Sequence, residues 1–205
     1  MARVLLVNPP SPERLGSPLL GQQYVAAALL AHGCEVKVID AAARFYPSSG
    51  ADRASDADLD AIVAEAEAFR PDMVGVALFT RWVWHAYRLV DKMRARFPLL
   101  VAGGAHATAC PDEPLARGFD FVLTGEAEES IVGLVDWLER GKALESIAGL
   151  RWLGPDGAPR TTGPSRFVEG LDRLAPPMLA QRLYDPRWYD PSGREVVPGG
   201  LLTSR

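Results

Sequence analysis

Short hydrophobic runs alternate with longer amphipathic stretches from the N-terminus to about residue 141. The runs are rich in leucine and branched residues, and the stretches between them have hydrophobic residues at helical spacing. This alternation predicts an α/β fold in which helices cover both faces of a doubly wound, five-stranded parallel sheet. The predicted strands are residues 3–7, 35–39, 73–79, 99–102 and 119–123, and the predicted helices are residues 20–32, 56–70, 83–97, 111–116 and 126–140.

Helix ends are marked by residues with strong backbone preferences. Gly33 and Gly141 follow the first and last predicted helices, and glycine readily adopts the left-handed conformation that closes a helix. Pro71 ends the second helix, because the residue before a proline avoids the helical region. Asp56 or Asp58 is expected to cap the start of that helix.

The pattern changes from Gly149 onward. Two short runs, residues 150–153 and 159–162, flank a Gly-Pro-Asp-Gly turn sequence that favours a β-hairpin. Prolines become frequent afterwards, so this part cannot build a core of its own. We therefore expect a main domain over residues 1–145, and a hairpin with an extended proline-rich connector over residues 146–205 that packs on a neighbour or leads into one.

Composition excludes several classes of function. The net charge is −4 and charge runs are short, so the chain lacks the basic stripe that a nucleic-acid partner requires. Cys34 and Cys110 have no CxxC spacing, which predicts neither a disulfide framework nor a metal knuckle and favours a cytoplasmic location. The first hydrophobic run stops at Pro9, too early for a signal peptide or a membrane span.

A ligand of such a sheet binds at the carboxyl ends of the strands, where the loops at residues 8–12, 80–82, 103–106 and 124–126 meet. Gly103 and Gly104 remove two side chains there, either to admit a ligand close to the backbone or to allow a positive φ in a turn. GxGxxG and GxxxxGK[ST] motifs are absent from the sequence, which argues against NAD, FAD and ATP.

Individual side chains in these loops have two interpretations each. His106 is a candidate ligand or acid-base group, or an ordinary loop residue. Trp82, Trp84 and Tyr87 are candidates for an aromatic wall around a ring system, or for core packing. The spacing of His, Cys and acidic residues predicts no metal site and no catalytic residue.

Four segments, in this order, resemble the N-terminal cobalamin-binding domain of cobalamin-dependent radical S-adenosylmethionine enzymes: VLLVNPP at residues 4–10, the loop after the third predicted strand at residues 80–82, VAGGAHAT at residues 101–108 and DFVLTGEAEES at residues 120–130. The resemblance covers about residues 3–140. It implies a flavodoxin-like (Rossmann-like) sheet with strand order 2-1-3-4-5. It also implies cobalamin contacts at Pro9, Pro10, Thr80, Arg81, Trp82, Gly103, Gly104, Ala105, His106, Thr124, Gly125 and Glu126.

The later segments GLRWLGPDGAPRTT, LDRLAPP and GGLLTSR resemble the connector that precedes the CxxxCxxC motif in that family. The resemblance implies that the chain stops before that motif. The four-iron four-sulfur cluster and S-adenosylmethionine then belong to a C-terminal barrel of the same parent chain. The resemblance further implies that the parent protein is a methyltransferase or an Fe-S oxidoreductase/cyclase. It also implies that this chain cannot perform radical chemistry by itself.

The first loop lacks the DxHxxG motif that supplies a cobalt-ligating histidine in other cobalamin domains. We therefore expect cobalamin to bind base-off and His-off, with Arg81 or Trp82 at the lower face of the corrin. Two alternatives remain at this stage: a stand-alone doubly wound domain that binds a small molecule or regulates a partner, and an interaction scaffold that uses the proline-rich tail. The loop beginning at Asn8 lacks the acidic pair of a receiver domain.

Overall fold

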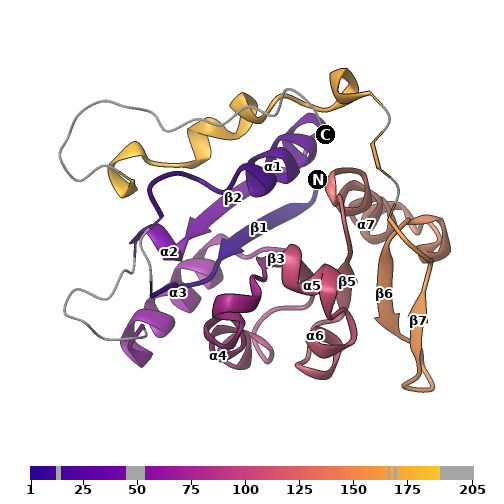
Figure 1. The fold of residues 1–205 in the computed structure, drawn as a ribbon, viewed down its shortest axis with the longest axis horizontal. Helices are drawn as coiled ribbons and strands as arrows, with labels where there is room; N and C mark the ends of the chain where they lie inside the picture. Colours follow the sequence, from indigo (N-terminus) through magenta and orange to yellow (C-terminus); the bar gives the residue numbers. More distant parts are fainter. Residues whose placement is uncertain (13–14, 45–53, 166, 169, 190–205) are drawn as a thin grey trace.

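A single sheet with strand order β2-β1-β3-β4-β5-β6-β7 runs through the described part of the chain (Figure 1). The computed structural model describes residues 1–12, 15–44, 54–165, 167–168 and 170–189. The strands are β1 (Arg3–Asn8), β2 (Glu35–Asp40), β3 (Met73–Ala77), β4 (Leu100–Gly103), β5 (Phe121–Leu123), β6 (Leu150–Leu153) and β7 (Pro159–Thr161).

The first five strands are parallel, and their order is the predicted 2-1-3-4-5. Strand β1 lies between β2 and β3, with Leu6 opposite Val38 on one side and Gly75 on the other. The connections from β1 and β3 therefore leave in opposite directions along the sheet, which opens a crevice at their carboxyl ends. The α/β fold class and the doubly wound order are confirmed.

The sheet is wider than predicted, because the hairpin adds two strands to it. Strand β6 pairs antiparallel with β5, placing Trp152 opposite Phe121, and β7 pairs antiparallel with β6. The predicted hairpin thus extends the five-stranded parallel sheet to seven strands in the described residues. The unpaired edge of β5 explains this, since its backbone groups gain hydrogen-bond partners from the hairpin.

Helices cover both faces of the sheet. Helices α1 and α7 lie on one face, and α3 and α4 lie on the other (Figure 1). The α-helices are α1 (Leu20–Ala31), α2 (Ala41–Arg44), α3 (Asp56–Phe69), α4 (Val83–Met93), α5 (Ala105–Ala109), α6 (Asp112–Ala116) and α7 (Glu128–Arg140). The 3-10 helices are η1 (Thr80–Trp82), η2 (Leu144–Ser146), η3 (Leu171–Arg173), η4 (Pro177–Leu183) and η5 (Pro186–Trp188).

Local chemistry sets the ends of these helices. Ser55 caps α3: its Oγ accepts a hydrogen bond from the Asp58 backbone N–H at 3.2 Å, and the Asp58 carboxylate accepts one from Ser55 N–H at 2.8 Å. The expected cap at Asp56 or Asp58 is thus corrected to Ser55. Gly141 closes α7 in the left-handed conformation, as predicted. Helix α4 ends at Met93, four residues earlier than predicted.

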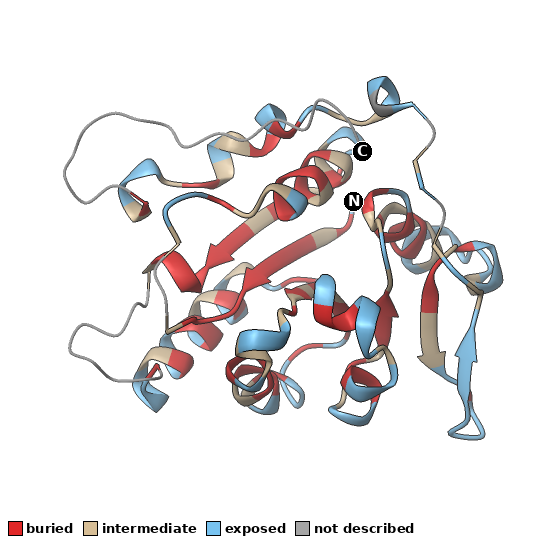
Figure 2. Cartoon of the chain, in the orientation of Figure 1, coloured by how far each residue is buried: buried red, intermediate tan, exposed pale blue. Residues whose placement is uncertain are grey.

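Each face of the sheet has its own hydrophobic core, because alternate strand residues point to opposite sides. Figure 2 shows that most of β1 and β2 is buried. Leu5 and Val74 pack beneath α3 and α4, whereas Val4 and Val101 belong to the core beneath α1 and α7. No helix in the described ranges is both long enough and apolar enough to cross a membrane.

The connector packs on the outside of α1. Helix η4 runs along α1, and Ala180, Tyr184 and Tyr189 are buried there. The Tyr184 hydroxyl donates a hydrogen bond to Gln22 Oε1 at 3.2 Å, and the Tyr189 hydroxyl donates one to Asp40 Oδ2 at 2.5 Å. The final GGLLTSR segment, on which part of the resemblance depends, lies outside the described residues.

Candidate functional site

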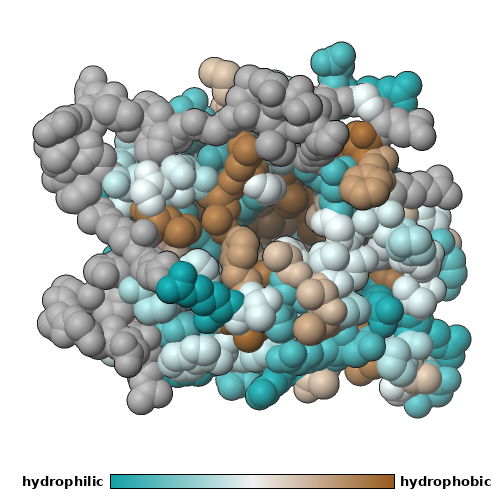
Figure 3. All heavy atoms as spheres, in the orientation of Figure 1, coloured by the Kyte–Doolittle hydropathy of each residue, from teal (hydrophilic) through white to brown (hydrophobic). Residues whose placement is uncertain are grey.

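A cavity of about 500 Å³ lies between the sheet and the helices α1 and α7. We call it the inter-layer cavity. Its floor is formed by β1, β3, β4 and β5, and its walls by the start of α1, the turn after β4 and the start of α7. Figure 3 shows a hollow on this side of the molecule with hydrophobic residues in and around it. Its position is the one that a doubly wound fold offers to a ligand.

Missing side-chain volume creates this cavity. Gly75 pairs with Leu6 and Val101 in the sheet, and a Cβ atom at Gly75 would lie 3.0 Å from Leu6 Cδ2. Gly103 lies at the end of β4, and a Cβ atom there would meet no atom within 4 Å. Ala77, its partner in β3, also has a small side chain. Gly103 and Ala77 therefore leave the backbone at the ends of β4 and β3 open toward α1, whereas the Leu6 side chain already lies over the backbone of Gly75.

Gly104 has a different role from Gly103. Its φ is +101°, and a Cβ atom would lie 2.8 Å from the Leu78 carbonyl oxygen. Leu78 N–H donates to Gly103 O at 2.7 Å, and His106 N–H donates to Leu78 O at 3.0 Å, so this turn is tied to the end of β3. Of the two explanations for the glycine pair, ligand space fits Gly103 and turn geometry fits Gly104.

A few polar side chains are among the residues that line the inter-layer cavity. Gln22 is buried and lines the cavity while its Oε1 accepts the hydrogen bond from Tyr184. Glu126 also lines it, and its Oε2 accepts a hydrogen bond from Val168 N–H at 2.8 Å. The lining of the cavity is therefore mostly apolar, with Gln22, Glu126 and Glu128 as its polar side chains, and the cavity reaches the connector through Gln22.

A smaller cavity of about 50 Å³ lies at the carboxyl ends of β1 and β3, among residues that include Asn8, Pro9, Pro10 and Trp82. Trp82 is held in place, because its indole N–H donates to Ser11 Oγ at 2.8 Å. The ring of Phe79 packs edge-on against Trp82, with 6.0 Å between centroids. This surface offers two proline rings and an aromatic ring beside the crevice.

A buried polar network supports this surface from beneath. Asp40, at the end of β2, accepts hydrogen bonds from Asn8 Nδ2 at 2.8 Å, from Ala43 N–H at 3.2 Å and from Tyr189. Burial raises the pKa of Asp40, although these hydrogen bonds and the nearby Arg44 act in the opposite direction. Burial and the Asp40 charge raise the pKa of Tyr189 as well. The network joins the first loop to the connector.

The structure brings together eight of the twelve predicted contact residues around these cavities. Those lining the inter-layer cavity are Gly103, Gly104, Ala105, Gly125 and Glu126. Those lining the smaller cavity are Pro9, Pro10 and Trp82.

Thr80, Arg81, His106 and Thr124 line neither cavity. The buried His106 ring lies close to Thr80 and Glu113, away from the inter-layer cavity. Thr124 Oγ1 donates to Gly149 O at 3.0 Å, which ties the loop after β5 to the start of the hairpin. The Arg81 guanidinium lies 5.6 Å from the centroid of the Trp82 ring.

The sequence analysis missed Gly75, Gln22 and the start of α7 as parts of the site. Gly75 could have been found, because a glycine inside a buried strand often marks the close approach of a ligand or another backbone. Gln22 gave no comparable signal, since its position depends on how α1 lies over the sheet. Trp84 and Tyr87 line neither cavity, so they form no wall of the site.

A family model described as "B12 binding domain" matches residues 17–135, which include every strand of the parallel sheet except β1. Its range includes the glycine pair, all of α1 and the first part of α7, up to residue 135.

Two curated relatives carry methyltransferase names. An uncharacterized methyltransferase of Pyrococcus horikoshii is 28% identical over 214 residues, covering 99% of this chain and 43% of that protein. The cytidylyl-2-hydroxyethylphosphonate methyltransferase of Streptomyces wedmorensis is 32% identical over 178 residues, covering 76% of this chain and 32% of that protein. The chain therefore spans less than half the length of these relatives.

Among solved structures, the cobalamin-dependent S-adenosylmethionine radical enzyme OxsB, with aqua-cobalamin and S-adenosylmethionine bound, matches with a TM-score of 0.67. The match has 16% sequence identity and covers 82% of this chain and 23% of OxsB. At this identity the likeness concerns the fold.

Proposed function

Because this chain belongs to the B12-binding domain family, we propose that its inter-layer cavity receives the nucleotide tail of cobalamin, with the corrin ring across the carboxyl ends of the parallel strands. The observation that carries this proposal is the open backbone of Gly103 beneath α1, where a Cβ atom would meet no atom within 4 Å. A tail with an aromatic base needs an apolar slot with few polar groups, and the lining of the cavity fits that need.

The residues at the strand ends fit the ring. Pro9, Pro10 and Trp82 present flat, apolar groups beside the crevice, and Asn8 is fixed by its hydrogen bond to Asp40. We propose that these residues and Arg81 lie toward the lower face of the corrin. Bound cobalamin supplies the group-transfer chemistry, whereas the chain binds the cofactor, orients it and shields its nucleotide tail from water.

We propose base-off, His-off binding. Two observations support it: the first loop lacks DxHxxG, and none of the three histidines, all of which the structure describes, lines either cavity. His32 pairs with Asp136 at 3.0 Å, and His85 is buried within α4. His106 lies beside Thr80 and Glu113.

The whole protein is proposed to be a radical S-adenosylmethionine enzyme. The methyltransferase names of the two relatives and the shared fold of OxsB support this, and a cyclase is the alternative that the sequence resemblance offers. We propose a cobalamin-binding domain over residues 1–145 and a hairpin and connector over 146–205. These would lead to a C-terminal barrel of the parent chain that holds the four-iron four-sulfur cluster and S-adenosylmethionine. The predicted cytoplasmic location stays a prediction.

The test is direct. The chain is incubated with hydroxocobalamin, desalted, and examined by visible absorption, with circular dichroism to confirm folding. We expect the corrin absorbance to remain with the protein. Its complete loss from a folded protein would contradict the proposal and favour a stand-alone domain for another small molecule.

The coordination state is tested on the loaded protein after reduction to the Co(II) form. Electron paramagnetic resonance is expected to show no superhyperfine splitting from an axial nitrogen. Splitting that persists would mean that a protein imidazole or the cofactor's own base ligates cobalt, and the His-off or base-off assignment would fail.

A further inference from the structure

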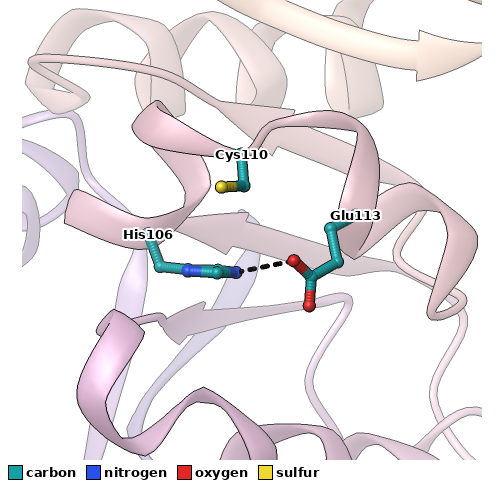
Figure 4. Close-up of side chains that lie close together, drawn as sticks. All are labelled: His106, Cys110 and Glu113. Carbon is teal, nitrogen blue, oxygen red and sulfur yellow. Dashed lines mark ion pairs between the residues drawn. The ribbon is translucent and has the colours of Figure 1, made fainter.

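Three potential metal ligands come together outside both cavities, at the junction of α5 and α6 (Figure 4). His106 belongs to α5, Glu113 belongs to α6, and Cys110 lies between the two helices. Their donor atoms all lie within 4.8 Å of one another, and His106 Nε2 is 3.4 Å from a Glu113 carboxylate oxygen. In Figure 4 the imidazole and the carboxylate face each other, with the thiol beside them.

The imidazole is already oriented for coordination. His106 Nδ1 lies 3.2 Å from Thr80 Oγ1, and the backbone N–H of His106 donates to Leu78 O. A hydrogen bond from Nδ1–H to Thr80 leaves the lone pair of Nε2 toward Glu113 and Cys110. Metal-binding histidines typically use their second nitrogen in this way, because it fixes both the tautomer and the ring orientation.

The ligand types select the ion. We propose that His106 Nε2, Cys110 Sγ and the Glu113 carboxylate bind one divalent zinc-type ion. Nitrogen, sulfur and oxygen donors together are the set that zinc accepts in tetrahedral sites, with a fourth position for water or another ligand. A thiolate and a carboxylate neutralise the two charges of the ion, and binding releases the thiol proton.

The surroundings allow the ion to enter. His106 is buried, whereas Cys110 and Glu113 are exposed, so the cluster opens to solvent on one side. The Tyr87 hydroxyl lies 3.4 Å from His106 Nε2.

Such an ion would tie α5 to α6 directly behind the turn that contains Gly104. That turn carries Gly103 to Ala105, which line the inter-layer cavity. The inference does not depend on corrinoid binding. The competing explanation of the cluster is a simple ion pair between His106 and Glu113. The two explanations differ in one respect, because only the metal site requires Cys110.

The experiment uses Co²⁺ as a spectroscopic substitute for zinc on protein prepared without corrinoid. Titration is expected to produce a near-ultraviolet charge-transfer band from thiolate to cobalt that saturates at one ion per chain. Added Zn²⁺ should remove the band by displacement. Absence of the band in the folded wild-type protein would overturn the proposal.

Variants assign the ligands. Cys110→Ser should abolish the charge-transfer band, and Glu113→Gln should weaken Co²⁺ binding at least about tenfold. Both residues are exposed, so both variants are expected to fold. Cys34→Ala is the matched control for the other cysteine, which is buried elsewhere, and it should keep the band. A band that survives Cys110→Ser, or that disappears in Cys34→Ala, would contradict the site.

Discussion

Both faces of the parallel sheet carry a hydrophobic core in the described residues, and the inter-layer cavity lies on the face beneath α1 and α7. Large side chains point toward α3 and α4, as in Leu5, Val74 and Leu100. On the opposite face, the positions nearest the carboxyl ends include Gly75, Ala77 and Gly103. The comparison teaches that side-chain volume, and not polarity, distinguishes the binding face from the structural face.

The contrast extends to the outer layer. On the cavity side, α1 is covered by the connector through Tyr184 and Ala180, whereas α3 and α4 face solvent with charged pairs such as Arg88–Asp56. One face of the sheet thus combines a loosely filled interior with an additional covering segment. The following predictions test this difference.

The largest expected effect is the loss of stability when a leucine that points toward α3 and α4 is truncated. Leu5→Ala should lower the free energy of unfolding by about 4 kcal/mol, because Leu5 is fully buried in dense packing. Leu6→Ala, its neighbour on the cavity side, should cost only about 2 kcal/mol because Leu6 already borders empty space. Urea unfolding of corrinoid-free protein measures both values. Equal losses would mean that the two faces are packed alike.

Filling the cavity should impair binding and leave the fold intact. Gly103→Leu is expected to reduce cobalamin affinity about 100-fold, or about 2.7 kcal/mol, while the unfolding free energy changes by less than about 1 kcal/mol. The reason is that a Cβ at this position meets no atom within 4 Å. Spectrophotometric titration with hydroxocobalamin gives the affinity. Gly103→Ala should lie between the wild type and Gly103→Leu, and an unchanged affinity for Gly103→Leu would place the tail elsewhere.

The neighbouring glycine should behave in the opposite way. Gly104→Ala is expected to cost about 2 kcal/mol of unfolding free energy, since its φ of +101° disfavours a side chain and the added Cβ would approach Leu78 O. Gly103→Ala is the matched comparison, with an expected stability change below about 0.5 kcal/mol. Thermal and urea unfolding compare the pair. A similar cost at both positions would refute the division of roles.

The smallest effect concerns the connector. Tyr189→Phe removes the hydroxyl that donates to Asp40 and should lower the unfolding free energy by about 1 kcal/mol at neutral pH. Chemical unfolding measures the difference. A Tyr189→Phe variant with the same unfolding free energy as the wild type would show that this hydrogen bond contributes nothing to the docking of the connector.

The same contact has a pH dependence with a definite sign. The folded-state pKa of Asp40 is above its ordinary value, so the folded chain holds this proton more tightly than the unfolded chain. The stabilisation from Asp40 is complete below about pH 4 and is lost as pH rises through the folded-state pKa. Asp40→Asn should therefore gain stability relative to wild type across that window. A constant difference over the pH series would contradict the raised pKa.

The doubly wound order and most strand positions could be predicted from the sequence because they depend on local periodicity and on well-established connection rules. Strand β1, helix α1 and the closing Gly141 agree with the pattern to within a residue or two. The short helices α2 and α5 were missed, since each is too short to show a period. The pairing of β6 with β5 was missed because the hydrophobic pattern along the chain does not show which strand forms the edge of the sheet.

The sequence by itself determined the fold class and the loops that surround the crevice, because the alternation of strand and helix patterns fixes which loops follow the strands. The resemblance of the segments in those loops indicated the family, which the family model confirms. Only the tertiary structure separated the roles of Gly103 and Gly104, and only it brought Gln22 to the cavity and Tyr189 to Asp40. The physical reason is that cavity volume and buried hydrogen bonds depend on how distant layers pack together. That packing is set by contacts between residues far apart in the chain.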